Sequence, residues 1–482
     1  MSDNFKKETL NGISWSVISQ GIRLVLNLLI TSVLARLLLP EDYGILGMVT
    51  VATGFLMVLK DFGFGAALVQ KKEVEAIEYD SVFWLNVIIG LFLAIIVFLA
   101  APLIANFYNE SAIIPVARLI SVSFIINSIL VIPNNILLKR LNFKYLFFSD
   151  LSALLVSGIT AILFAYYNFS YWSLVAQNLA LQISTLIAVF YFSQWRPRFR
   201  FSKTALQDLT SFSLPLIADK SINYWVRNVD YLLIGKFLGK ADLGYYTKAY
   251  TLMMLPVRQL SGTISKVMFP SFSTIQNDLA RVRSVFLKIS GVIALVSFPL
   301  MGLLFISAEE VILILFGSNW EQSIPIFRVL CLLGAIQSIS TLSGNIYLSQ
   351  GKTKLMFKIG LFTRFLMISG IVIGLYYKGL MGLVYGYTVS SLIASMIEWY
   401  FVGNVLEAGL KYIILNLLPY FIFSGLMIGL IFLFNINFNL ENKFSSMFLN
   451  IILGGGFYII LLLIFKPKAY LEVLALIKQR SL

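Results

Sequence analysis

Apolar runs of about 20 residues recur along the whole chain, and each is long enough to cross the hydrocarbon core of a bilayer. Hydrophobic residues make up 59% of the 482 residues and charged residues only 12%, whereas soluble proteins carry roughly a quarter charged residues. Most of the protein surface must therefore face something other than water. The sequence predicts an all-α integral membrane protein whose soluble stretches are too short for an extramembrane catalytic domain.

The hydropathy pattern predicts about 14 transmembrane helices, and a count of about 12 or 13 stays open because three of the spans are unusually polar. The predicted spans are 14–35, 44–66, 81–105, 114–134, 146–166, 171–193, 211–235, 244–267, 284–306, 324–348, 356–377, 380–403, 413–434 and 447–465.

Lys and Arg residues set the predicted orientation, since short loops that stay in the cytoplasm carry an excess of them. Basic segments include 139–144, 195–203 and 352–354, whereas the loops 106–112 and 307–310 contain no Lys or Arg. Both termini are therefore predicted to be cytoplasmic. The net charge of +14 is explained by this topology and by contact with anionic membrane lipids, so no nucleic-acid partner is expected.

The chain is also predicted to contain an internal repeat. A shift of 200 residues places ARLLLPEDYG (35–44) on GKFLGKADLG (235–244), and a shift of 210 residues extends the match through the later spans. Six spans per repeat, an even number, give both repeats the same orientation, so an axis along the membrane normal should relate them. We predict two pseudo-symmetric six-helix lobes, an N-lobe at 1–200 and a C-lobe at 201–407, with two further helices and a tail at 408–482.

The segment DKSINYWVRNVDY (219–231) carries charges where a membrane-spanning helix is expected. At 100° per residue, its polar residues share one face about 100° wide. These residues are Asp219, Lys220, Asn223, Arg227 and Asp230. Four charges facing lipid would cost about 10–14 kcal/mol, so this face must point inward, at a partner or at water.

The first predicted span carries a second polar stripe, which includes Gln20, Arg23 and Asn27. The repeat register places this stripe level with the one at 219–231, and two facing stripes predict a hydrated central cavity. Within the spans, basic residues outnumber acidic residues such as Asp150 and Glu398. We therefore predict a cationic cavity that accepts an anion, although intramembrane ion pairs that only hold helices together stay open as an alternative for any one residue.

Five segments resemble the Wzx-type polysaccharide flippases of the multidrug/oligosaccharidyl-lipid/polysaccharide exporter superfamily, in particular the colanic acid and teichuronic acid exporters. The segments are ARLLLPEDYG (35–44), DFGFGAALVQ (61–70), NILLKRLNFK (135–144), YWSLVAQ (171–177) and GYYTKAYTLMMLPVRQLSGTISKVMFPSFS (244–273). The resemblance covers about residues 8–405. It implies alternating access and export of undecaprenyl-diphosphate-linked oligosaccharide from the inner to the outer leaflet of the bacterial cytoplasmic membrane, for lipopolysaccharide or exopolysaccharide biosynthesis.

The resemblance further implies a cationic lumen in the first and seventh helices, which maps here to Arg23, Lys220 and Arg227. Two further arginines are predicted to lie deep in the membrane, so five basic residues are expected to bind the diphosphate: Arg23, Lys220, Arg227, Arg258 and Arg364. The candidate glycan contacts are Gln20, Asn27, Asn223, Tyr224 and Trp225. Asp219 and Asp230 are candidates for coupling to a proton or sodium gradient. No catalytic residue, metal site or cofactor is expected. The chain is expected to be a monomer, with a polysaccharide polymerase and a chain-length regulator as partner proteins.

Other functions stay open. A multidrug antiporter of the same fold would prefer an acidic cavity for cationic drugs, and the excess charge here is basic. A polyprenyl-dependent glycosyltransferase, polymerase or acyltransferase would need catalytic groups, but the chain contains no histidine, the commonest general base, and no long external loop. A channel or structural subunit would not need two repeat-related polar stripes.

Overall fold

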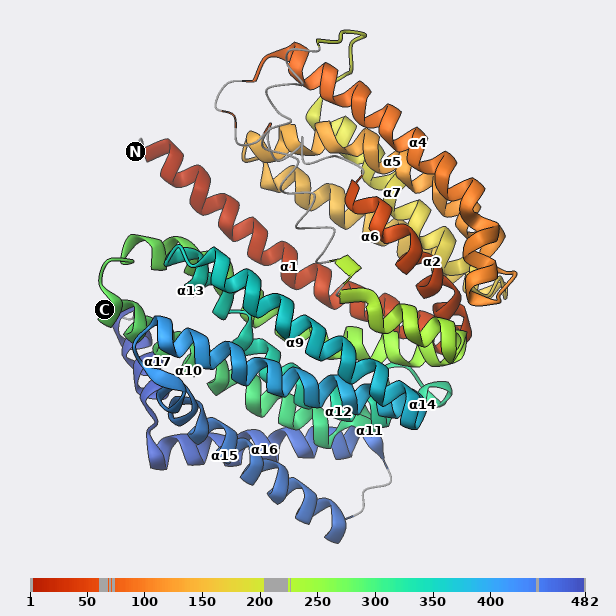
Figure 1. The fold of residues 1–482 in the computed structure, drawn as a ribbon. Helices are drawn as coiled ribbons and strands as arrows, with labels where there is room; N and C mark the ends of the chain where they lie inside the picture. The colour runs from red at the N-terminus through yellow and green to blue at the C-terminus, as the bar shows by residue number, and fades with distance from the viewer. Residues whose placement is uncertain are drawn as a thin grey trace. The chain divides into compact units, whose positions relative to one another are not determined.

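The computed structural model describes residues 3–59, 68, 71, 74–202, 224–225, 227–438 and 442–480, leaving out the side chains of 3–19, 261–263, 265–267 and 476–480. Every regular element in this part of the chain is a helix (Figure 1). Among the described residues, 11 helices are long and apolar enough to cross a membrane. The predicted all-α membrane fold is confirmed, while the count of about 14 helices stays a prediction.

The chain divides into two compact units, Met1–Gly244 and Tyr245–Leu482, which we call unit 1 and unit 2. The helices of unit 1 are α1 (Asp3–Leu37), α2 (Pro40–Leu59), α4 (Ala76–Tyr108), α5 (Ile113–Lys139), α6 (Phe143–Tyr166) and α7 (Trp172–Ser193). Residues 227–237 are also helical and belong to this unit. Within unit 1, α5 packs between α4 and α7, and α6 packs against α1 and α7. The predicted boundaries at 200 and 407 stay predictions.

Helix α9 (Lys240–Thr274) begins at the end of unit 1 and continues into unit 2. The other elements of unit 2 are α10 (Leu279–Ile306), α11 (Ala308–Leu315), η1 (Ser318–Trp320), α12 (Ser323–Ser340), α13 (Ser343–Ser349), α14 (Thr353–Val405), α15 (Gly409–Asn437), α16 (Lys443–Phe465) and α17 (Lys468–Arg480). Hydropathy did not predict α11, η1 or α17, because all three are too short to span a bilayer.

Helix α14 consists of two helices joined at Lys378 and Gly379, whose backbone angles are not helical. This break falls between the predicted spans 356–377 and 380–403. The two halves touch through glycines, because a Cβ atom on Gly374 would overlap the carbonyl oxygen of Gly382, and the reverse also holds. Small residues at such positions let membrane helices approach closely.

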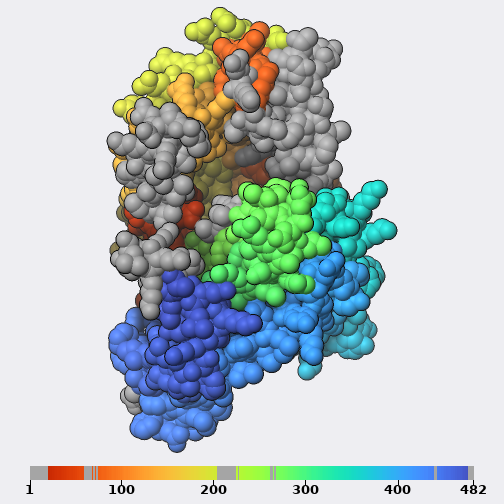
Figure 2. Space-filling model, turned by 90° about the vertical axis from the view of Figure 1, so that its left-hand side faces the viewer, coloured from red at the N-terminus to blue at the C-terminus, as the bar shows by residue number. Residues whose placement is uncertain are grey.

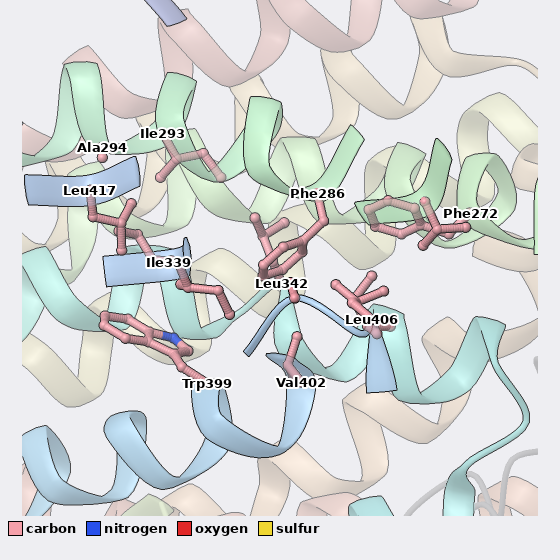
Figure 3. Packing of buried hydrophobic residues seen from close by; sticks show 14 of the residues in the cluster. Phe272, Phe286, Ile293, Ala294, Ile339, Leu342, Trp399, Val402, Leu406 and Leu417 are labelled. Carbon is pink, nitrogen blue, oxygen red and sulfur yellow. The ribbon is translucent and has the colours of Figure 1, made fainter. Parts of the chain in front are cut away.

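The core of unit 2 is a cluster of buried apolar side chains contributed by α9, α10, α12, α14 and α15 (Figure 3). Phe286 of α10, Ile339 of α12 and Trp399 of α14 lie within it, with exposures of 5% or less. In a bilayer this packing stabilises the fold through van der Waals contact, since lipid tails are as apolar as the side chains. The cluster makes unit 2 a compact body by itself.

Helix α17 lies on the surface of unit 2 (Figure 2). The backbone N–H of Ala469 donates to the hydroxyl of Tyr420 on α15 at 3.1 Å, and Lys288 of α10 pairs with Glu472 at 3.4 Å. The C-terminal tail is thus a docked helix and not an extended segment.

Candidate functional site

Arg23 lies on α1 and forms an ion pair with Asp150 of α6, with 2.5 Å between Nη1 and Oδ2. The two side chains are 51% and 37% exposed, so the pair is open to its surroundings. About two turns further along α1 and α6, Gly158 of α6 allows the two helices to pack closely, because a Cβ atom there would overlap the side chain of Ile30 on α1. The structure therefore places the predicted Arg23 in the site and adds Asp150, which the sequence showed only as one intramembrane carboxylate among several.

Gln20 and Asn27, the predicted neighbours of Arg23 on α1, are also exposed. They lie three and four residues from Arg23, which places all three side chains on one side of the helix. The polar stripe predicted for the first span is therefore an open polar surface of unit 1, with a guanidinium at its centre. Their contact with sugar stays a prediction.

Tyr224 packs against α2 and makes a contact that the sequence did not predict. Its hydroxyl donates to the carbonyl oxygen of Val51 at 2.8 Å and lies 3.2 Å from the carbonyl oxygen of Thr50. Gly54 makes room for it, because a Cβ atom there would overlap the same hydroxyl. The neighbouring Trp225 is 41% exposed and open to a ligand.

Three residues predicted for this stripe, Asp219, Lys220 and Asn223, lie outside the described residues. Arg227 is exposed, and among the described residues it forms no ion pair. Asp230, one turn later, is buried, and its Oδ1 accepts the backbone N–H of Tyr231 at 2.9 Å. Arg227 is therefore open to its surroundings, whereas its contact with an anion and a coupling role for Asp230 stay predictions.

The two remaining predicted arginines belong to unit 2. Arg258 of α9 is exposed. Arg364, on the first half of α14, is partly buried and interacts electrostatically with Glu398 on the second half. The structure thus links Arg364 to a carboxylate of its own hairpin. That all the predicted basic residues gather in one cavity stays a prediction.

The two repeat segments ARLLLPEDYG and GKFLGKADLG contact each other directly within unit 1. A Cβ atom on Gly44 would overlap the carbonyl oxygen of Lys240, and a Cβ atom on Gly244 would overlap the carbonyl oxygen of Pro40. Pro40 and Lys240 are themselves equivalent under the shift of 200 residues. The contact is therefore reciprocal, and glycine at both positions is what allows the backbones to touch.

Ion pairs surround this reciprocal contact. Lys240 Nζ lies 3.0 Å from Glu110 Oε2 and 3.4 Å from Glu41 Oε2. Lys240 lies between two predicted spans, and its hydrogen bond to Glu110 raises its pKa above the usual lysine value. Lys236 donates to the carbonyl oxygen of Phe107, and Ser170 donates to Asp42. These contacts join four loops that were all predicted to lie outside the cell.

The segments predicted to be cytoplasmic meet one another in the same way. Lys139 donates to the carbonyl oxygen of Lys71 at 2.6 Å, and the indole of Trp84 donates to the carbonyl oxygen of Arg198 at 2.9 Å. The backbone N–H of Arg198 in turn donates to Asp80 at 3.1 Å. Loops of one predicted side therefore contact each other, as alternating spans require, while the assignment of each end to a compartment stays a prediction.

No group of three or more His, Cys, Asp or Glu side chains in the described part of the chain could hold a metal ion. What the site offers instead is exposed guanidinium groups on membrane helices, with amides and an indole on the same helices. Guanidinium binds phosphate oxygens in pairs, and aromatic and amide groups suit sugars. These groups have the chemistry that an anion with a polar attachment requires, and that they bind such a ligand stays a prediction.

Comparisons with known proteins show which proteins this chain resembles. Residues 33–325 match the model of a family described as polysaccharide biosynthesis protein. The lipopolysaccharide biosynthesis protein WzxC of Escherichia coli K12 is 28% identical over 433 residues, which are 87% of this chain and 86% of that protein. The teichuronic acid biosynthesis protein TuaB of Bacillus subtilis 168 is 28% identical over 355 residues, 73% of each chain. A structure of the lipid II flippase MurJ in an inward closed conformation matches with a TM-score of 0.75 at 16% identity, covering 94% of this chain and 98% of that one.

Proposed function

The chain belongs to the polysaccharide biosynthesis protein family, and we propose that it flips undecaprenyl-diphosphate-linked oligosaccharide units from the inner to the outer leaflet of the bacterial cytoplasmic membrane. The match of residues 33–325 to the family model confirms the predicted link to polysaccharide biosynthesis, and the relatives WzxC and TuaB support it. The names of these relatives, which refer to lipopolysaccharide and teichuronic acid biosynthesis, support a lipid-linked glycan as the passenger here.

The observation that carries the proposal is the exposed guanidinium of Arg23 on a membrane helix, between the exposed amides of Gln20 and Asn27. An arginine at the centre of a spanning helix costs about 2.5–3.5 kcal/mol if it faces lipid. A diphosphate repays that cost, since it carries about two negative charges and its oxygens match the guanidinium fork. The amides would bind the sugars, while the polyprenyl tail stays in the lipid.

Alternating access supplies the movement. The reciprocal contact at Gly44 and Gly244 joins the predicted external ends of the first and second repeats, which supports closure of that end while the substrate enters from the cytoplasmic side. Its ion pairs are partly exposed, and such pairs contribute only about 0–1 kcal/mol each, so the contact can open. A proton or sodium gradient, acting at Asp219 or Asp230, would drive the transport cycle. The protein would work as a monomer, would catalyse no reaction and would deliver the translocated units to a polysaccharide polymerase.

A complementation experiment tests this function. In a strain that lacks the gene, the wild-type chain should restore surface polysaccharide, whereas Arg227→Ala should lower it at least about tenfold, because about 1.4 kcal/mol or more of anion binding is lost. Arg281→Ala removes another exposed arginine, which lies in the first turn of α10 just before the predicted span 284–306. This variant is the control and should restore polysaccharide fully.

The outcome also separates the alternatives. Full restoration of polysaccharide by Arg227→Ala would contradict a role for the Arg227 guanidinium in binding the passenger. Unchanged surface polysaccharide in the strain that lacks the gene would contradict glycan export and favour a drug antiporter. Loss of surface polymer from the strain that lacks the gene, while lipid-linked units still reach the outer leaflet, would favour an enzyme acting after translocation.

A further inference from the structure

The pair formed by Arg23 and Asp150 raises a question that the proposed function does not answer: what neutralises the diphosphate-binding arginine when no substrate is bound. The two groups lie at similar depth, roughly 21 Å from the C-terminal end of α1 and roughly 24 Å from that of α6. At that depth an unpaired guanidinium is unfavourable, and the empty carrier must still return to collect the next substrate.

We propose that Asp150 is a resident counter-ion that occupies the anion-binding side of Arg23 in the empty carrier and is displaced by the diphosphate of the substrate. A carboxylate and a phosphate present the same feature to guanidinium, two oxygens that accept hydrogen bonds from its planar fork. Both therefore compete for one group. The inference rests on the proposed function, since it assumes a diphosphate substrate.

The exposure of the pair makes the exchange feasible. The side chain of Arg23 is 51% exposed and that of Asp150 is 37% exposed, so neither partner of the 2.5 Å contact is enclosed by the protein. Ion pairs exposed to this extent are weak, so an incoming dianion can replace the single carboxylate. A fully buried pair would resist such exchange, because breaking it leaves an uncompensated charge.

The packing around the pair gives the exchange a mechanical consequence. Arg23 and Asp150 lie about two turns from the contact of the Ile30 side chain with Gly158, which is an apolar contact between α1 and α6. Displacement of Asp150 removes the polar tie between the two helices and leaves the apolar contact in place. Asp150 is thus a positioning residue that lets substrate occupancy change how α1 sits against α6.

Binding of undecaprenyl diphosphate to the purified full-length chain in lipid nanodiscs tests the inference. Asp150→Asn removes the competing charge and should tighten binding about two- to fivefold, the range expected for a weak exposed ion pair. Asp150→Glu keeps the charge and should bind like the wild type. Arg23→Ala should bind more weakly, and adding Asp150→Asn to it should change nothing further. Asp150→Ser gives a second reading should Asp150→Asn not yield monodisperse protein.

Ser152→Ala is the matched control, because the Ser152 hydroxyl bonds only to the backbone of its own helix among the described residues, at Ser149 O. Weaker or unchanged binding by Asp150→Asn would overturn the inference, as would tightening that persists without the Arg23 side chain. Undecaprenyl diphosphate binding by the wild type no better than by empty nanodiscs would overturn the proposed substrate together with this inference.

Discussion

Single polar residues in the membrane helices differ in what they contact, and these contacts decide their roles. Arg23 faces a carboxylate that a diphosphate can replace, whereas the hydroxyl of Tyr224 is already bound to the backbone of α2. Helical spacing predicted the position of Arg23, whereas Tyr224 was expected only as a contact for the glycan of the substrate. The sequence could not predict their partners, because Asp150 and Val51 are far away in the chain and no local pattern connects them.

Tyr224 therefore tests whether a predicted glycan contact is in fact a helix contact. Tyr224→Phe keeps the ring over Gly54 but removes one hydrogen bond, which contributes about 0.5–1.5 kcal/mol. We expect a thermal midpoint lower by about 0.5–1.5 °C for the purified protein, with export retained in the complemented strain. An unchanged thermal midpoint with weaker export would contradict this role and support a contact between Tyr224 and the glycan.

At the level of elements, apolar length located most helices, and the break in α14 coincides with a boundary placed by hydropathy. The short helices α11 and α17 were missed because they lie beside the membrane spans, where hydropathy carries little information. In the sequence, Gly44 and Gly244 are recognisable only as equivalent positions of the repeat. Only the structure shows that both glycines allow the backbones of the two repeats to touch.

The reciprocal contact can be broken by adding one methyl group. Gly44→Ala and Gly244→Ala each place a Cβ atom on a carbonyl oxygen of the other repeat, and overpacking of this kind typically costs about 1–3 kcal/mol. We expect both substitutions to lower export several-fold and to a similar extent, measured as surface polysaccharide at equal protein abundance.

Gly425→Ala provides the comparison, since nothing lies within 4 Å of the added Cβ atom at this position of α15. This variant should export like the wild type. Normal export by Gly44→Ala and Gly244→Ala would show that closure at these glycines is not part of the transport cycle.

At the level of the whole molecule, membership of a polysaccharide exporter family and an all-helical membrane fold were predictable from the sequence. The apolar runs, the distribution of charge and the segments that resemble the family are spread along the chain. A prediction based on all of them together therefore does not depend on any single residue. The arrangement of the charged residues was less predictable, since Arg364 interacts with Glu398 across a hairpin and Asp230 is buried beside an exposed Arg227. These differences depend on tertiary packing and not on spacing along one helix.

Leaflet sidedness of the lipid-linked glycan tests flipping most directly. Spheroplasts of a strain without the gene are treated with a membrane-impermeant probe that labels undecaprenyl-diphosphate oligosaccharides only on the outer leaflet. A flippase requires that the units accumulate unlabelled, facing inward, and that the wild-type chain restores labelling while Arg227→Ala does not. Accumulation of labelled, outward-facing units in the strain without the gene would contradict flipping and place the protein after translocation.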